Sequence, residues 1–292
     1  MSFLNAIFGS RTNGNEEKGK DNKNFDTLKY DGVRALKQGQ PAFAIKCFTH
    51  ALEISEDLEC RDYLSQAYIA NDELAPAYEQ LQLLSEAQPD NVAISLRMAE
   101  VAYMQEDYDA MATACEKALE IDKENPTIFY SYARACNGQG NAISAIALLT
   151  KALTIKDDFA PAHLLRGELL LKLGDTKGAA EDAAYLKEHV EGNEDVMLLS
   201  ARVAEKSGDH DQAIADYGKV IEANPFNAAA FKERGAIRLA IGDNKGAEED
   251  MRSVLELDPN AANNVTGDYS AEGVEHKAHG AYRSVDPFGI FG

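Results

Sequence analysis

Residues 107–122, DYDAMATACEKALEID, carry the pattern that decides the fold, because the position of Met111 within them recurs along the chain. A small or apolar residue returns every 34 residues at Ala77, Met111, Ala145, Ala179, Ala213 and Ala247. The same step separates Ser65, Ala99, Ala133, Gly167, Ala201 and Gly235, as well as Gly140, Gly174, Gly208 and Gly242. A fixed period of this length indicates a tandem repeat in which each copy is one supersecondary unit.

Each copy contains two apolar segments separated by a glycine. In one copy they are Phe129, Tyr132, Ala133 and Cys136, followed by Ala145, Leu148, Leu149 and Ala152. Spacings of three and four residues are typical of amphipathic helices. The glycine allows the left-handed backbone that ends the first helix, and a proline such as Pro225 stops the second. The sequence therefore predicts an all-α chain of helical hairpins, stabilised by stacking of neighbours.

The period predicts seven copies, which we expect at residues 25–57, 58–91, 92–125, 126–159, 160–193, 194–227 and 228–259. This pattern resembles the tetratricopeptide repeat family, in which two helices of about 34 residues carry small, aromatic, alanine and proline markers. The resemblance covers roughly residues 25–259, nearly all of the chain that is expected to be ordered, although the family's tryptophan is absent. It implies a right-handed α-solenoid whose concave groove is lined by the first helix of each hairpin.

The charge balance of the 292-residue chain constrains its partners. The chain has 49 acidic and 29 basic residues, which gives a net charge of -20. Nucleic acid and anionic membranes are repelled by such a chain. We therefore expect a protein or peptide partner that is apolar with basic residues, and no nucleic acid.

Cysteine spacing and apolar runs bear on the location of the chain. Cys47, Cys60, Cys115 and Cys136 show neither a CxxC pair nor zinc-type spacing, so reduced structural thiols are expected. No apolar run approaches the ~18–20 residues that span a bilayer. Residues 1–10, MSFLNAIFGS, lack the features of a signal peptide. The sequence predicts a cytoplasmic protein that is not an integral membrane protein.

Both ends of the chain differ from the repeats. Residues 1–24 comprise a short apolar segment and, at 11–24, a charged stretch whose composition predicts a disordered linker. Residues 260–292 form a tail with an apolar end. The two ends either cap the outer hairpins or act as docking peptides, and both interpretations stay open. The candidate docking residues are Phe3, Leu4, Ile7, Phe8, Phe288, Ile290 and Phe291.

The resemblance places one face of each first helix in the groove. On that face Glu100, Arg134, Glu168 and Arg202 alternate in sign. The alternation either forms a ladder that fixes the register of neighbouring helices or meets the charges of a ligand, because apolar and aromatic residues share the face. The candidate groove residues are Leu96, Glu100, Tyr103, Met104, Tyr130, Arg134, Leu164, Glu168, Leu171, Leu198, Arg202 and Leu239.

Capture of a chaperone's carboxyl terminus is a known use of this family, and it requires lysines, asparagines and an arginine on three successive repeats. Lys29 and Arg97 match that set. The two asparagines and the remaining lysine are replaced by Val33, Tyr63 and Ala93. Because a buried carboxylate would lack hydrogen-bond donors, the sequence argues against chaperone-tail binding.

No catalytic, cofactor or metal site is predicted. The sequence has no phosphate loop, GxSxG elbow or HExxH motif. Asp209, His210 and Asp211 resemble a metal site, but they follow Gly208 at a hairpin turn. There Asp209 is expected to cap the next helix, with Gln212 completing a capping box.

The remaining histidines give weak signals. His276 and His279 lie close to Glu275 and admit a metal hypothesis, but the neighbouring Gly273 and Gly280 favour a solvated tail. The other histidines within the repeats, His50, His163 and His189, are expected to be packing or surface residues.

Together these patterns predict a non-enzymatic scaffold or adaptor without a cofactor, which binds a peptide or helix of another protein in its concave groove. The alternative is a regulatory or assembly component that self-associates, or is autoregulated, through its apolar terminal segments.

Overall fold

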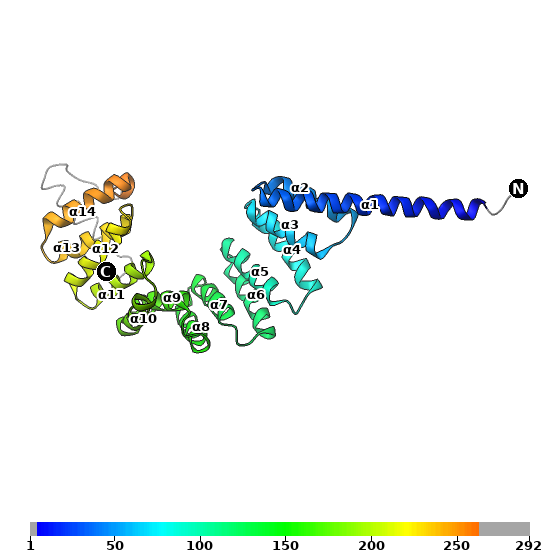
Figure 1. Ribbon diagram of the computed structural model, residues 1–292. Coiled ribbons are helices and arrows are strands. Elements are labelled where there is room, and N and C mark those ends of the chain that lie inside the picture. The colour runs from blue at the N-terminus through cyan, green and yellow to red at the C-terminus, as the bar shows by residue number, and fades with distance from the viewer. Residues whose placement is uncertain (1–4, 263–292) are drawn as a thin grey trace. The chain divides into compact units, whose positions relative to one another are not determined.

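The computed structural model describes residues 5–262, which form fourteen α-helices and a short 3-10 helix without any strand (Figure 1). The helices are α1 (Asn5–Lys37), α2 (Pro41–Ile54), α3 (Leu58–Ala70), α4 (Leu74–Ala87), α5 (Val92–Met104), α6 (Tyr108–Ile121), α7 (Pro126–Gly138), α8 (Ala142–Ile155), α9 (Ala160–Lys172), α10 (Thr176–His189), α11 (Glu194–Lys206), α12 (His210–Ala223), α13 (Ala228–Ala240) and α14 (Asn244–Leu257), followed by η1 (Pro259–Ala262). From α3 onward, every second helix begins 34 residues after the last, so the helices keep the period of the sequence. The predicted all-α array of hairpins is confirmed.

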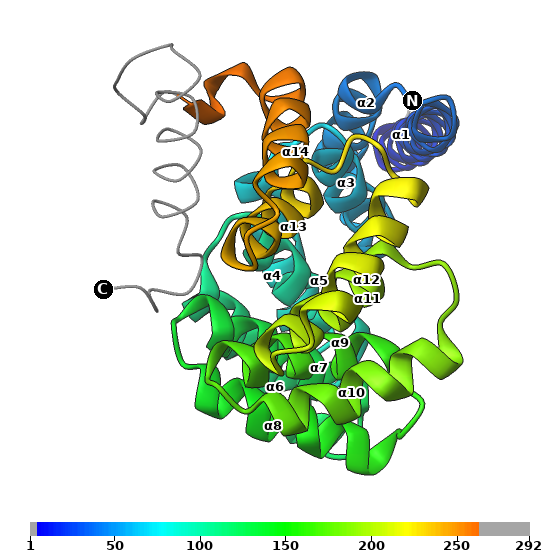
Figure 2. The same cartoon turned by 90° about the vertical axis from the view of Figure 1, so that its left-hand side faces the viewer.

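The helices fall into two compact units, Met1–Ala145 and Ile146–Gly292, whose boundary lies inside α8. In the first unit α1 packs on α2, α3 on α4 and α5 on α6, and each of these hairpins contacts the next element along the chain. In the second unit α9 packs on α10, α11 on α12 and α13 on α14. Figure 2 shows α13 and α14 side by side from a second direction. Each unit is therefore built from sequential, local packing.

The turn inside each hairpin is a Schellman motif, and the α11–α12 turn shows its parts. Gly208 has a φ of 80° and donates its amide to the carbonyl of Glu205, while Asp209 donates its amide to the carbonyl of Ala204. The Asp209 carboxylate then accepts from the amide of Gln212 at 3.1 Å and caps α12, as predicted. The expected capping box is not completed, because the Asp209 amide is already bound to Ala204. The acidic triplet is thus a helix boundary.

Small residues of the repeat stand where helices approach closely. A β-carbon at Gly167 would lie 2.8 Å from a methyl carbon of Leu199 and 3.2 Å from the β-carbon of Asp182. These neighbours belong to α11 and α10, so one glycine of α9 serves two helix contacts. The series that contains Met111 is buried throughout, at 0–1% exposure. The period of the sequence is therefore the period of the core.

Two buried aspartates lock hairpins of the second unit. Asp182 on α10 is 1% exposed and receives Nε and Nη2 of Arg166 at 2.9 and 2.7 Å, together with the ring of His163 at 2.6 Å. Asp250 on α14 is also 1% exposed and receives the same two nitrogens of Arg234 at 3.1 and 2.6 Å. Since both pairs join the two helices of one hairpin, they fix its internal register.

Helix α1 differs from the expectation for the N-terminal region. Residues 11–24, where composition predicts a disordered linker, lie within one helix that continues into the first hairpin. Extension of an existing helix adds one hydrogen bond per residue without a new nucleus, and residues 11–24 contain no proline to stop it. Of the predicted terminal residues, Ile7 and Phe8 lie in α1. Phe3, Leu4, Glu275, His276, His279, Phe288, Ile290 and Phe291 lie outside the described residues.

Candidate functional site

In the first unit, α5 and α7 bring together charged and aromatic candidates of the predicted groove. Arg134 donates from Nη1 to Glu100 at 2.8 Å, and its guanidinium carbon lies 3.7 Å from the ring centroid of Tyr103. The ring of Tyr130 lies further away, at 5.9 Å. Ion pairing and a cation–π contact therefore hold the arginine in one position. We name the surface formed by Glu100, Tyr103, Met104, Tyr130 and Arg134 the Arg134 patch.

The Arg134 patch combines a fixed charge with exposed apolar area. Tyr103 and Met104 are 38% and 45% exposed. Burial alone would lower the pKa of Arg134, but the hydrogen bond and charge of Glu100 outweigh it and raise the pKa. Leu96, another candidate groove residue, is half-buried and packs against the core. An exposed tyrosine and methionine beside a positioned arginine form the kind of surface that anchors a partner side chain.

The alternating charge ladder does not continue in the second unit. Arg202 on α11 donates from Nε and Nη2 to Glu233 on α13, at 2.8 and 2.7 Å. Tyr217, fully buried, donates to the same carboxylate at 2.7 Å. These bonds raise the pKa of Arg202 above its ordinary value. Within the described residues Arg202 directs these hydrogen bonds to Glu233 and not to Glu168. Desolvation raises the pKa of Glu168 despite the attraction of that arginine. The sequence missed Glu233 because it lies outside the alternating series.

Two candidate groove residues of the second unit belong to the core instead. Leu171 is 6% exposed and packs with Leu199, and Leu198 is 9% exposed and packs with Tyr217. Neighbouring helices cover both side chains, so neither is available to a ligand. Leu164 and Leu239 remain half-buried at their places on α9 and α13.

Lys29 and Arg97, which match the residues that hold a chaperone's carboxyl terminus in this family (the clamp positions), already pair with carboxylates of this chain. Lys29 donates to Asp57 at 2.9 Å and to Glu59 at 2.7 Å. Burial would lower the pKa of Lys29, but these two carboxylates raise it. Arg97 pairs with Asp62 and donates to Ser65 Oγ at 2.6 Å. Since both cations already pair with carboxylates of this chain, a ligand carboxylate would compete with those partners for them.

The part of the chain that the structure describes contains no group of three or more histidine, cysteine or acidic side chains that could hold a metal ion. Burial raises the pKa of the Cys60 thiol to about 11 and that of Cys115 to about 12, which leaves both as thiols near neutral pH. Within the same residues no helix is long and apolar enough to cross a membrane.

The histidines of the repeats have structural contacts. His163 is buried, and its two ring nitrogens face Asp182 and the carbonyl of Asp157. His50 and His189 are exposed and contact Glu53 and the carbonyl of Tyr185. These contacts lie within or between neighbouring helices, as packing or surface residues would make them.

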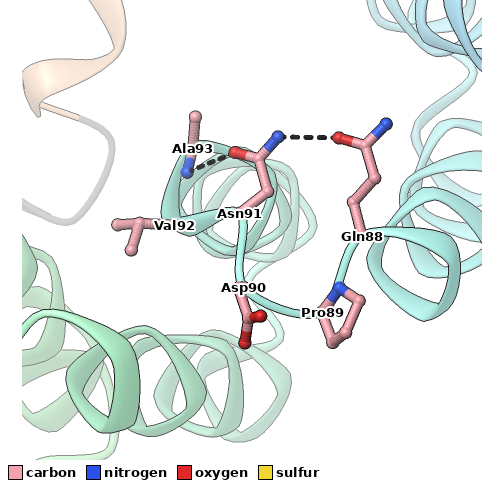
Figure 3. Close-up of a pocket in the computed structure, with 6 residues that line it drawn as sticks. All are labelled: Gln88, Pro89, Asp90, Asn91, Val92 and Ala93. Carbon is pink, nitrogen blue, oxygen red and sulfur yellow. Dashed lines mark hydrogen bonds between the residues drawn. The ribbon is translucent and has the colours of Figure 1, made fainter.

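A recess beside the α4–α5 loop is lined by residues that are not among the candidate groove residues. Figure 3 shows its rim, where Asn91 accepts from the amide of Ala93 at 3.2 Å and donates to Gln88 Oε1 at 2.9 Å. One cavity of about 510 Å³ is lined by residues 88–93. A second of about 510 Å³ shares Gln88, Asn91 and Ala93 with it. The sequence signal for this recess was Ala93, which stands where the family's clamp has a lysine, because a short side chain leaves space there.

Comparisons with known proteins agree with this architecture. A family model described as "Tetratricopeptide repeat" matches residues 198–262. The human DnaJ homolog subfamily C member 3 is 30% identical over 154 residues, covering 45% of this chain and 31% of its own length. The Hsp70-Hsp90 organizing protein 3 of Arabidopsis thaliana is 25% identical over 206 residues, with coverages of 68% and 35%. The chain thus spans about a third of the length of these relatives.

Solved structures show the same fold. A tetratricopeptide repeat protein from Parabacteroides merdae superposes with a TM-score of 0.67 at 15% identity, covering 89% of this chain and 99% of the other. The type IV pilus biogenesis factor PilW gives a TM-score of 0.62 at 18% identity, with coverages of 75% and 97%. YrrB, described as having an unusual peptide-binding site, gives 0.53 at 18% identity, with coverages of 67% and 96%.

Proposed function

We propose that the chain, whose residues 198–262 match the tetratricopeptide repeat model and whose fold matches a solved tetratricopeptide repeat protein, is a non-enzymatic adaptor. In this proposal it binds a segment of another protein on the exposed face of its first helices. The observation that carries this proposal is the Arg134 patch. There an arginine is held in place by Glu100 and Tyr103, beside exposed apolar area of Tyr103 and Met104. A surface fixed before binding loses less conformational entropy when a partner docks.

The partner, in this proposal, is an apolar segment with basic residues. Support comes from the net charge of -20, which attracts basic partners and disfavours anionic ones. The neutralised cations of the clamp positions, Lys29 and Arg97, argue in the same direction. We propose a cytoplasmic location, which the four buried, free cysteines support because a reducing compartment keeps thiols unpaired.

The proposal is tested by affinity capture from source-cell lysate with the wild type, Arg134→Glu and the matched control Arg252→Glu. Arg252 is an exposed arginine on α14 whose ion pair with Glu248 stays on the surface of one helix. We expect a protein that is captured by the wild type and the control and lost with Arg134→Glu. Identical captures by all three proteins would contradict a role of the Arg134 patch.

A second candidate function is self-association, and one observation favours it. Tyr63 on α3 stacks on Phe48 of the preceding hairpin with ring centroids 5.7 Å apart. Tyr30 is its counterpart in the first hairpin, where no earlier hairpin exists among the described residues, and it is 78% exposed. Phe43 on α2 is 51% exposed. Light scattering at rising concentration tests this candidate, and a strict monomer throughout would contradict it.

A further inference from the structure

The second cavity of the α4–α5 region, here named the Ala93 cavity, has an apolar floor and a charged wall. The apolar part is formed by Leu58, which is 40% exposed, and by the buried Leu84 and Ile94. Its full lining is Leu58, Glu59, Asp62, Leu84, Gln88, Asn91, Ala93, Ile94 and Arg97. All of these residues belong to the first unit, so α3, α4 and α5 build the cavity together.

The charges at the Ala93 cavity leave an excess of one carboxylate. Lys29 is bound by Asp57 and Glu59, and Arg97 is bound by Asp62. Two cations therefore face three carboxylates. An acidic ligand would have to compete with these carboxylates for Lys29 and Arg97. A basic ligand would meet carboxylate oxygens that remain accessible, because the side chains of Glu59 and Asp62 are 64% and 35% exposed.

The rim of the cavity is fixed before any ligand arrives. Asn91 caps α5 through its bond to the amide of Ala93, and its other side-chain atom holds Gln88 (Figure 3). Ala93 itself is exposed and contributes only a methyl group, so space remains above Ile94 where a lysine or arginine would fill it. A preformed pocket with an apolar floor favours a side chain of matching polarity.

We propose that the Ala93 cavity binds an apolar side chain of a partner peptide. In that peptide a lysine or arginine lies within two residues of the apolar residue, on either side, and its basic group contacts Glu59 and Asp62. This inference rests on the proposed protein-binding function and assigns it a ligand chemistry. It reverses the charge preference that the resemblance attaches to this part of the repeat, because carboxylates now outnumber the cations that would hold an acidic ligand.

The test is selection of a random ten-residue peptide library displayed on phage against three proteins: the wild type, Ala93→Trp and Thr127→Trp. Ala93→Trp places an indole in the cavity and leaves every residue of the ion pairs unsubstituted. Thr127 occupies the equivalent exposed place on α7, one repeat later, and provides the matched control. Thermal melting checks that all three remain folded. The best peptide is then measured by fluorescence anisotropy, along with a version in which its basic residue is glutamate.

We expect peptides that pair an apolar residue with lysine or arginine to be enriched on the wild type and on Thr127→Trp. Binding of the best peptide should weaken at least ~10-fold on Ala93→Trp and also when its basic residue becomes glutamate. Absence of enrichment, enrichment that survives Ala93→Trp, or acidic consensus peptides would each overturn the inference. The capture experiment on Arg134 uses a different surface, so its outcome separates failure of this inference from failure of the proposed function.

Discussion

Glu106 adopts a backbone conformation that most hairpin turns of this chain reserve for glycine. Its φ is 57°, and the equivalent residues Gly140, Gly174, Gly208 and Gly242 have φ between 78° and 88°. A side chain in the left-handed region costs about 1 kcal/mol relative to glycine. Glu106→Gly should therefore raise the free energy of unfolding by about 0.5–1 kcal/mol, as measured by urea denaturation.

The reverse change provides the control for this turn. Gly208→Ala places a β-carbon in the same conformation and should lower stability by about 1 kcal/mol. Nothing lies within 4 Å of the position that this carbon would take, so the loss measures backbone strain and not a clash. Equal effects of the two substitutions, in the same direction, would contradict this account of the turns.

Cys60 and Cys115 should resist alkylation while the protein is folded. Burial raises the pKa of these thiols from 9.0 to about 11 and about 12, so little thiolate exists at pH 8. Mass spectrometry after iodoacetamide treatment should find them unmodified in buffer and modified in denaturant. Rapid labelling of the native protein would show that they are accessible.

The same shifts have a consequence for stability at high pH. Because the folded state holds the Cys60 and Cys115 thiols protonated, their contribution is complete below pH 9 and is lost as pH rises through their folded pKa values of about 11 and 12. Replacing both by alanine should flatten the loss of stability above pH 9 in denaturation measured across pH. If stability falls with pH equally steeply in this variant, the loss of stability above pH 9 comes from other groups.

At the scale of elements, the buried aspartates hold two helices of a hairpin together. Asp182→Ala leaves Arg166 and His163 without their shared carboxylate, and we expect a loss of about 3 kcal/mol. Glu181→Ala, at the exposed neighbouring position of α10, should change stability by less than about 0.5 kcal/mol. Chemical denaturation of both variants compares them, and equal losses would show that the ion pair contributes nothing specific.

How much of these elements follows from sequence differs between backbone and side chains. The 34-residue period predicts the hairpins and their turns, because small residues and glycines act through local backbone geometry. It does not predict that Arg202 pairs with Glu233, since that choice depends on rotamers and on which neighbouring carboxylate is nearer. The equal spacing of Arg166–Asp182 and Arg234–Asp250, 16 residues in each, was a usable signal.

Composition misled the prediction for α1. The polar stretch at residues 11–24 has the composition of a linker, yet the chain there continues the helix of the first hairpin. Composition describes what a segment can bury, whereas a helix that is already nucleated extends at low cost. The Ala93 cavity was missed for a related reason, because a cavity depends on what three helices leave empty and not on one motif.

At the scale of the whole molecule, charge should govern partner binding. With a net charge of -20, long-range attraction to a basic partner is screened as ionic strength rises. The association rate of a captured partner should therefore fall between low and physiological salt, as measured by surface plasmon resonance, while the dissociation rate changes less. An association rate that is independent of salt would contradict a basic partner.

The central claim is that the first helices, and not the second helices, present the partner-binding face. Site-specific photocrosslinking tests it most directly, with p-benzoylphenylalanine placed at Met104 on α5 or at Leu83 on α4. The two side chains are similarly exposed, at 45% and 43%, so accessibility alone does not distinguish them. In source-cell lysate we expect a discrete adduct from position 104 and none from position 83. An adduct from position 83 alone, or the same adducts from both, would contradict the claim.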